Sequence, residues 1–255
     1  MKNAINWKLF RILLLVSLIT SLMAMPYALT LVADMGLVIT PILFVAQIIQ
    51  ALILFSITIF LGLYLAKRVG FGLPILEGWL KGENQKGNLK AILGLSIGLG
   101  VLVALLIIVF SIPFGTLSVD FLKAEIVIPS WKLILVSFYG GIAEEVLLRL
   151  FFMTFLVWLT FKIKKTSAGK PTIIGIWIAI ILSSVIFGLG HLPITSGVTA
   201  ITPVVVIRAI VLNGIGGVVF GYLYWKKGLE SAMISHFSAD ISLHVILPLL
   251  AGILL

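Results

Sequence analysis

Three ionisable residues, Glu144, Glu145 and Arg149, lie inside one long apolar stretch of the chain. Ionisable groups are costly in a membrane and usually mark a functional site. On a helix, Glu145 and Arg149 stand four positions apart on one face and can form an ion pair. Glu144 points roughly 100° away and is expected to lack a partner on that helix. A buried carboxyl group without a partner suits a general base or a proton carrier; the alternative is a structural ion cluster that holds helices together.

Two further apolar segments carry histidines at helical spacing. Phe187 and His191 share one helix face at the end of the first of these segments. His236, Asp240 and His244 form a stripe along the last segment. Asp240 can accept a hydrogen bond from a neighbouring imidazole and fix its tautomer, or it can lie beside that imidazole in a reaction centre. The alternatives are an interfacial His191 and a polar stripe that closes a helix interface.

The composition assigns these residues to a polytopic membrane protein. The chain has 255 residues, of which 61% are hydrophobic and 11% charged, and it contains no cysteine. A soluble domain is about 45–50% apolar and roughly a quarter charged. A water-soluble enzyme, a disordered tail and a collagen-like fibre are therefore excluded. Without cysteine there is no disulfide framework, no zinc–thiolate site and no cysteine nucleophile.

Apolar segments of membrane-spanning length recur along the chain. A helix needs about 20 mostly apolar residues to cross a hydrocarbon core of roughly 30 Å. The first segment continues to Val32, which favours an uncleaved anchor over a signal peptide. The segment 229–255 is either one tilted span or two short helices parted near Ser242 or Pro248, so seven or eight spans are expected. The predicted spans are 9–32, 37–66, 89–112, 131–161, 172–192, 204–225 and 229–253.

Basic residues predict the orientation of these spans. The chain has 18 Lys and Arg against 9 Asp and Glu, which gives a net charge of +9. The positive clusters fall on alternate loops, as they do when Lys and Arg collect in the cytoplasm. The N-terminus and the loops 67–90, 162–170 and 226–228 are therefore predicted to be cytoplasmic. We expect an integral protein of a prokaryotic plasma membrane, with membrane lipid and no nucleic acid as a partner, and a short interfacial turn at Ile75 to Leu80.

The segments are predicted to form one domain. No internal repeat, linker or low-complexity tract divides the chain. We therefore expect a single membrane-embedded domain over residues 1–255, built as an all-α bundle of seven or eight transmembrane helices. Residues 1–112 form its peripheral spans in this prediction, and residues 131–255 form a motif-bearing catalytic core in the C-terminal half.

The charged and histidine motifs together resemble those of one protease family. The three motifs occur in order on separate apolar segments and are Glu144-Glu145-x-x-x-Arg149, Phe187-x-x-x-His191 and His236-x-x-x-Asp240. This pattern resembles the CPBP family of intramembrane proteases, also called the Abi or CAAX protease family. The resemblance covers residues 144–240 and implies an all-helical membrane fold. It also implies an endopeptidase, either a glutamate protease or a metalloprotease, that cleaves hydrophobic or lipidated substrates such as CAAX prenyl proteins.

The resemblance implies a task for each pair of motif residues. One pair activates the attacking water, one stabilises the oxyanion of the tetrahedral intermediate, and one supports the site. The water is activated by Glu144 and His191, the oxyanion is stabilised by His236 and Asp240, and the site is supported by Glu145 and Arg149.

The role of Asp240 and the presence of a metal stay open in this assignment. Position 240 is often Asn in the family and is Asp here. Because an ionised carboxylate repels an oxyanion, Asp240 must be protonated, orient His236 or contact a metal. The family has also been described as metal-dependent. Glu144, His191 and His236 are an acceptable ligand set for a divalent metal such as zinc.

The predicted spans place the two motif histidines at different heights. Counted from the cytoplasmic ends, His191 lies about 30 Å along its span and His236 about 10–15 Å along its own. Either the helices around 162–170 project beyond the cytoplasmic surface, or the spans are tilted and broken so that a water-filled cavity joins the two sites. We expect the projection, because the stretch 158–165 can continue as helix. Arg208, at the start of the sixth span, is expected to be an interface or headgroup residue.

Two other functions are compatible with the same residues. Buried Glu, His and Asp side chains can relay protons in a proton-coupled transporter. The absence of Pro- or Gly-broken helices in matching halves speaks against a transporter. A non-catalytic membrane partner, such as an immunity protein that occupies a toxin's target, is the third hypothesis.

Overall fold

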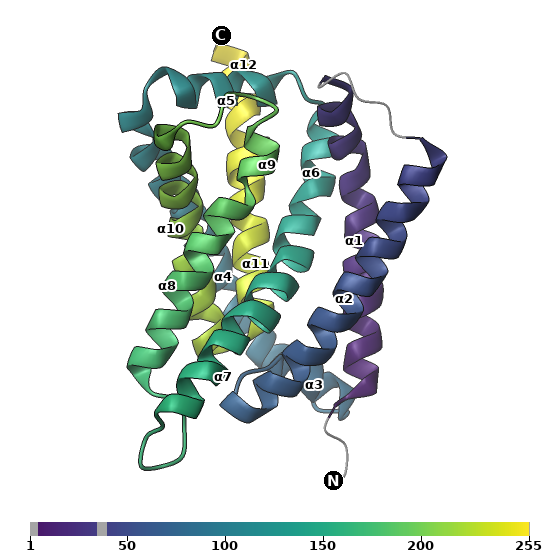
Figure 1. Cartoon of the computed structure of the whole chain (residues 1–255), viewed down its shortest axis with the longest axis vertical. Coiled ribbons are helices and arrows are strands. Elements are labelled where there is room, and N and C mark those ends of the chain that lie inside the picture. The colour runs from purple at the N-terminus through teal and green to yellow at the C-terminus, as the bar shows by residue number, and fades with distance from the viewer. Residues whose placement is uncertain (1–4, 35–39, 255) are drawn as a thin grey trace.

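The computed structural model describes residues 5–34 and 40–254, and these residues are helical apart from loops and one isolated β-bridge between Lys165 and Pro171. Seven helical stretches are long and apolar enough to cross a membrane, so the chain is an integral membrane protein. Figure 1 shows them packed as a bundle along the long axis of the molecule.

Five of the spans are single helices or nearly so, and two are assembled from consecutive helical segments. The first, second, third, fifth and sixth spans are α1 (Trp7–Asp34), α2 (Pro41–Val69), α4 (Lys86–Ser111), α8 (Ile173–Gly190) and α10 (Pro203–Lys227). The fourth span consists of α6 (Ser130–Phe138), η2 (Tyr139–Glu144), η3 (Val146–Met153) and α7 (Thr154–Ile163). The seventh consists of α11 (Leu229–Asp240), η4 (Ile241–Ile246) and α12 (Leu247–Leu254). The short connecting helices are α3 (Pro74–Leu80), η1 (Ile112–Phe114), α5 (Thr116–Ile126) and α9 (Leu192–Thr195).

The seven predicted spans are confirmed, and the alternative of an eighth is wrong. The helical path continues through Ser242 in η4 and Pro248 in α12, so the last segment is one span. The short turn expected at Ile75 to Leu80 is α3. The start of the predicted second span, residues 37–39, lies outside the described residues.

Threonine, proline and glycine set the ends of two spans. Thr40 and Thr202 each accept a hydrogen bond from the backbone N–H three residues later, and each is followed by a proline. Proline fits there because the first turn of a helix has no partner for its N–H. Gly70 and Gly228, with φ of 79° and 97°, end α2 and α10 in backbone conformations that favour glycine.

The fourth and seventh spans contain π-helix around the predicted catalytic residues. The π-helical segments η2 and η3 flank Glu145, and η4 begins directly after Asp240. Such winding is rare and is frequent at functional sites. The α-helical spacing expected around Glu144 is therefore wrong in detail, because each π-turn holds an extra residue.

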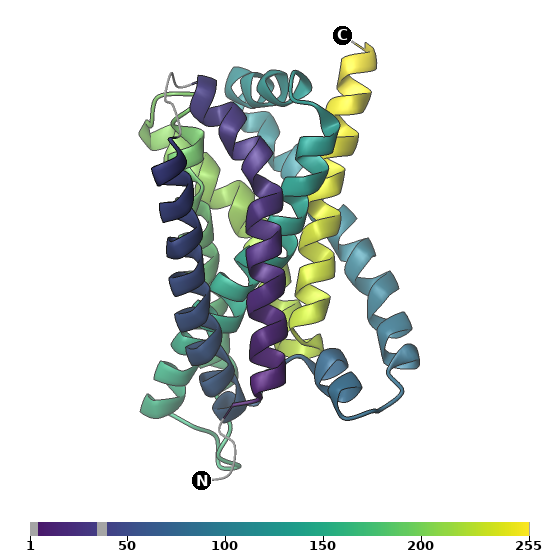
Figure 2. The same cartoon turned by 90° about the vertical axis from the view of Figure 1, so that its right-hand side faces the viewer.

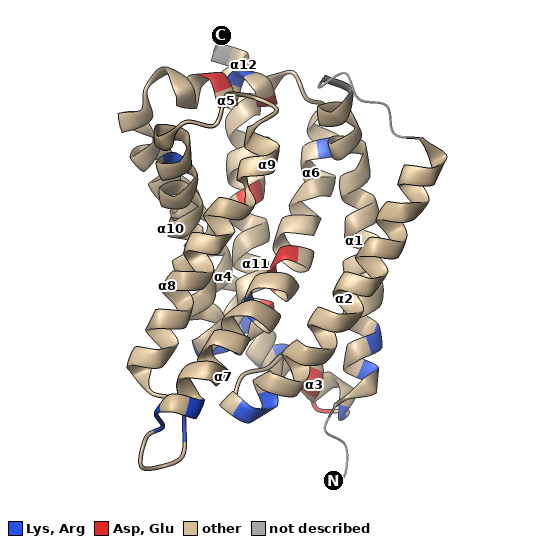
Figure 3. Ribbon diagram, in the orientation of Figure 1, with Lys and Arg blue, Asp and Glu red and all other residues tan. Residues whose placement is uncertain are grey.

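The basic loops gather at one end of the bundle, as their alternation along the chain predicts. Figure 3 shows Lys and Arg concentrated at the end where α1 begins. The loops 67–90, 162–170 and 226–228 lie there, and we call this the basic end. We call the opposite end, formed by α5, α9 and the start of α6, the α5 end. The cytoplasmic location of the basic end stays a prediction.

Small residues hold α11 tightly against α4. A Cβ at Gly100 would collide with the backbone carbonyl of Ser235 and lie 2.7 Å from Ser238 Cβ. The hydroxyls of Ser96 and Ser231 are 2.7 Å apart and bond the same two helices. Small residues allow such close approach between membrane helices. This contact fixes the helix that carries His236.

Replacement of Gly100 by valine is expected to push α4 away from α11 and destabilise the protein by about 1–3 kcal/mol, the usual cost of overpacking. The measurement is the thermal unfolding temperature in detergent. Gly98→Val is the matched control, because a Cβ at Gly98 meets nothing within 4 Å. Equal unfolding temperatures for the two variants would contradict the close crossing.

Candidate active site

Glu145, Arg149 and His236 form a buried charged network. Arg149 Nη1 lies 3.0 Å from Glu145 Oε1, and His236 Nδ1 lies 2.8 Å from the same oxygen. Arg149 Nη2 also donates to the carbonyl oxygen of Gly217 in α10, at 3.3 Å. Glu145 and Arg149 are fully buried, and His236 is 4% exposed. The fourth, sixth and seventh spans therefore meet at one carboxylate.

Two phenylalanine rings hold this network in place. The His236 ring stacks on Phe220, with 4.6 Å between centroids, and meets Phe187 edge-on at 5.5 Å. The guanidinium carbon of Arg149 lies 4.8 Å from the Phe187 centroid and 5.5 Å from that of Phe220. A desolvated cation is stabilised over an aromatic face. These contacts fix the orientation of the His236 imidazole.

The network borders a cavity of about 660 Å³, which is lined by His236, Glu144, His191 and Asp240. His236 Nε2 lies 3.5 Å from Asp240 Oδ1 and 3.9 Å from Glu144 Oε2. The Glu144 side chain is 24% exposed, whereas that of Glu145 is fully buried. Gly140 makes room for this arrangement, because a Cβ there would collide with the Asp240 carboxylate.

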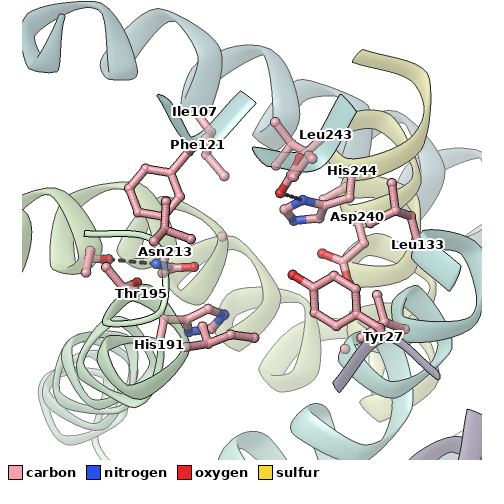
Figure 4. A pocket seen from close by; sticks show the side chains of 18 of the residues that line it. Tyr27, Ile107, Phe121, Leu133, His191, Thr195, Asn213, Asp240, Leu243 and His244 are labelled. Carbon is pink, nitrogen blue, oxygen red and sulfur yellow. Dashed lines mark hydrogen bonds and ion pairs between the residues drawn. The ribbon is translucent and has the colours of Figure 1, made fainter. Parts of the chain in front are cut away.

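His191 follows the last residue of α8 and has one ring nitrogen committed to the backbone. Its Nδ1 lies 2.8 Å from the carbonyl oxygen of Phe187. Because a carbonyl oxygen only accepts, Nδ1 carries the proton, and in the neutral ring Nε2 is an acceptor. Figure 4 shows His191 and Asn213 on one wall of the cavity, across from Asp240 and His244.

Unequal helix ends bring the two motif histidines together despite their different positions along the spans. In Figures 1 and 2, the hairpin between α7 and α8 extends further at the basic end than the turn between α10 and α11. His191 and His236 consequently line the same cavity, and Phe187 contacts both rings. The projection of the 162–170 region beyond the cytoplasmic surface stays a prediction.

The contact between Glu145 and His236 could not be predicted from the sequence. The prediction gave Asp240 as the residue that can fix the imidazole, but Glu145 makes the shorter contact, at 2.8 Å against 3.5 Å. Glu145 and His236 are 91 positions apart, and no local spacing connects them. Asp240 instead lies beside Nε2, where it faces the cavity.

A second set of charged side chains lines the cavity toward the α5 end. His244 Nδ1 lies 2.7 Å from Oε1 of Glu125, which belongs to α5. Arg208 also lines the cavity, with its guanidinium carbon 4.1 Å from the Phe121 centroid. That Arg208 is an interface or headgroup residue stays a prediction, and its side chain also lines the cavity. The sequence indicated His244 in the stripe with His236 and Asp240, but its contact with Glu125 depends on the packing of α5 over the bundle.

The side chains do not fit a metal site as they are arranged. Glu144, His191 and His236 share the cavity, but among residues 5–34 and 40–254 no group of three His, Asp or Glu side chains is placed to hold a metal ion. No step of the reaction proposed below passes through a metal.

The comparison with known families confirms the resemblance. Residues 126–242 match the family described as Rce1-like, type II CAAX prenyl endopeptidases, so this part of the chain is similar to that family of hydrolases. The match lies in the C-terminal half and contains all six predicted site residues. No curated protein and no solved structure is significantly similar to the chain.

Replacement of Arg149 by methionine is expected to destabilise the protein by about 3–5 kcal/mol, because it leaves a buried carboxylate without its cation. Thermal unfolding in detergent measures the loss. The double variant Arg149→Met, Glu145→Gln removes both charges and is expected to regain most of the stability. If the single and double variants unfold at the same temperature, the ion pair is not the stabilising contact.

Proposed function

We propose that the chain is an intramembrane endopeptidase, similar to the CAAX proteases, that cleaves a peptide bond with water activated by Glu144 and His191. The observation that supports this most is the shared cavity, which both side chains line together with an imidazole held by a buried ion pair. The Rce1-like match supports the same reaction class. We also propose hydrophobic or lipidated peptides as substrates, membrane lipid as a partner and a cytoplasmic N-terminus.

In this proposal, the attacking water is activated by Glu144 and His191. The bond from His191 Nδ1 to the Phe187 carbonyl leaves Nε2 free to accept a hydrogen bond from water. The partly exposed Glu144 carboxylate takes the water proton as the water oxygen bonds to the peptide carbon. The same proton then passes to the amide nitrogen, and the carbon–nitrogen bond of the tetrahedral intermediate breaks.

The oxyanion of the tetrahedral intermediate is stabilised by His236 and Asp240 in this proposal. An imidazolium at His236 donates Nδ1–H to Glu145 and Nε2–H to the oxyanion. Glu145 is a positioning residue, because it acts through His236, and Arg149 balances its charge. A protonated Asp240, beside Nε2, supplies a second donor without the repulsion of a carboxylate.

Removal of the activating groups is expected to stop cleavage without unfolding the protein. Glu144→Gln and His191→Ala should each lower the rate by a factor of about 10²–10⁴, the usual contribution of general acid–base catalysis. The assay uses internally quenched apolar peptides and the purified protein in liposomes. Glu83→Gln is the control for loss of a carboxylate, because Glu83 is exposed at the basic end, outside the cavity. Wild-type turnover by Glu144→Gln would rule out the proposal.

The role of Asp240 is separable by two substitutions. Asp240→Asn keeps a hydrogen-bond donor of similar size and is expected to remain active. Asp240→Ala loses the donor and is expected to be slower by a factor of about 10²–10³, as for other oxyanion donors. The same peptide assay measures both. Equal losses in the two variants would assign the function to the negative charge of Asp240 instead.

A further inference from the structure

The cavity reaches the surface at the α5 end of the bundle. Its lining includes exposed residues of α5 and of the segment around α9, among them Asp120, Lys123, Gly197 and Val198. Glu144 and His236 lie further inward, toward the middle of the fourth span, whereas His191 directly precedes α9. The path from the surface to Glu144 therefore runs from the α5 end inward.

Between the catalytic side chains and the basic end, packed side chains fill the bundle. In the fourth span, Leu150, Met153 and Val157 follow Arg149 toward the basic end and are fully buried. Tyr224 of α10 fills the centre at that level, 1% exposed, with its hydroxyl 2.9 Å from that of Thr154. None of these residues lines the cavity. No passage leads to the site from the basic end in the described part of the chain.

The charge distribution predicts that the basic end and the α5 end lie on opposite sides of the membrane. The basic loops 67–90, 162–170 and 226–228 lie at the closed end, whereas the open end carries Asp120, Lys123 and Glu125 in α5. Short loops rich in Lys and Arg remain in the cytoplasm. This rule predicts that the closed end is cytoplasmic and that the open end lies outside the cytoplasm.

We infer that the cavity admits its substrate from outside the cytoplasm, and that the substrate is an exported peptide or the outward-facing segment of a membrane protein. That the molecule that enters is a substrate rests on the proposed function, whereas the direction of access does not depend on it. The cavity walls between the rim and Glu144 include Ile107, Leu133, Val136 and Leu243, so the peptide carries apolar side chains near its scissile bond. A lipidated protein tail presented from the cytoplasm does not reach the site.

Cysteine labelling tests the direction of access, and the chain is suited to it because it has no cysteine. Ser196→Cys marks the rim and Leu243→Cys the cavity wall, and Ser167→Cys marks the exposed α7–α8 loop at the basic end. A membrane-impermeant thiol reagent is applied to right-side-out and inside-out vesicles. The first two variants are expected to react only in right-side-out vesicles and Ser167→Cys only in inside-out ones. The reverse pattern would overturn the inference.

Cleavage by oriented vesicles tests the substrate class. An internally quenched apolar peptide that does not cross the membrane is added to both vesicle types, with Glu144→Gln vesicles as the blank. Cleavage is expected in right-side-out vesicles and is expected to be lost in inside-out ones. Cleavage only in inside-out vesicles would overturn the inference. Absence of cleavage in both would remove the proposed function, whereas the labelling result would still decide the side from which the cavity opens.

Discussion

The burial of one ion pair, Glu145 with Arg149, is the constraint on which the arrangement of the site depends. Charges in a low-dielectric interior are tolerated only with close partners on several sides. Glu145 takes a second partner, His236, from the seventh span, and Arg149 takes the Gly217 carbonyl from the sixth and the ring of Phe187 from the fifth. Four spans are thereby held around one carboxylate, and the position of His236 Nε2 in the cavity follows from them.

The glycines beside the network are a consequence of the same constraint. Side chains on different helices can contact one another around the Glu145 carboxylate only if the helix backbones approach closely, and small residues permit this. A Cβ at Gly217 would lie 2.7 Å from Ser184 Cβ, and one at Gly188 would lie 2.6 Å from the Ile210 Cα. Both glycines lie where α8 and α10 pack together. The close packing of these helices and the ion network therefore support each other.

Features that depend on one helix at a time could be predicted from the sequence. Hydropathy and length gave the seven spans, and a separation of four residues gave the pair Glu145 and Arg149. The motifs predicted the family, since residues 126–242 match it. Together these account for the fold class and the residues that line the inner part of the cavity.

Contacts between spans could not be predicted, because they depend on packing rather than on spacing. The bonds of Glu145 to His236 and of Glu125 to His244 join residues 91 and 119 positions apart. The π-helical winding around Glu145 has no signature in hydropathy, and it changes the directions that an α-helix assigns to neighbouring side chains. The place of Arg208 in the cavity likewise depends on α5, an interfacial helix without buried residues.

A cavity with one opening favours hydrolysis over transport. A transporter must expose its site to each side of the membrane in turn. Here the way toward the basic end is filled by Leu150, Met153 and Tyr224, which are packed directly beyond the ion network. Opening that side would separate the fourth span from α10 and break two buried hydrogen bonds, from Arg149 to the Gly217 carbonyl and between the hydroxyls of Thr154 and Tyr224. A hydrolase needs no second opening, because its products can leave as the substrate entered. Arg149, which pairs with the carboxylate that orients the imidazole, therefore also bonds the fourth span to α10 and helps to keep the cavity closed on this side.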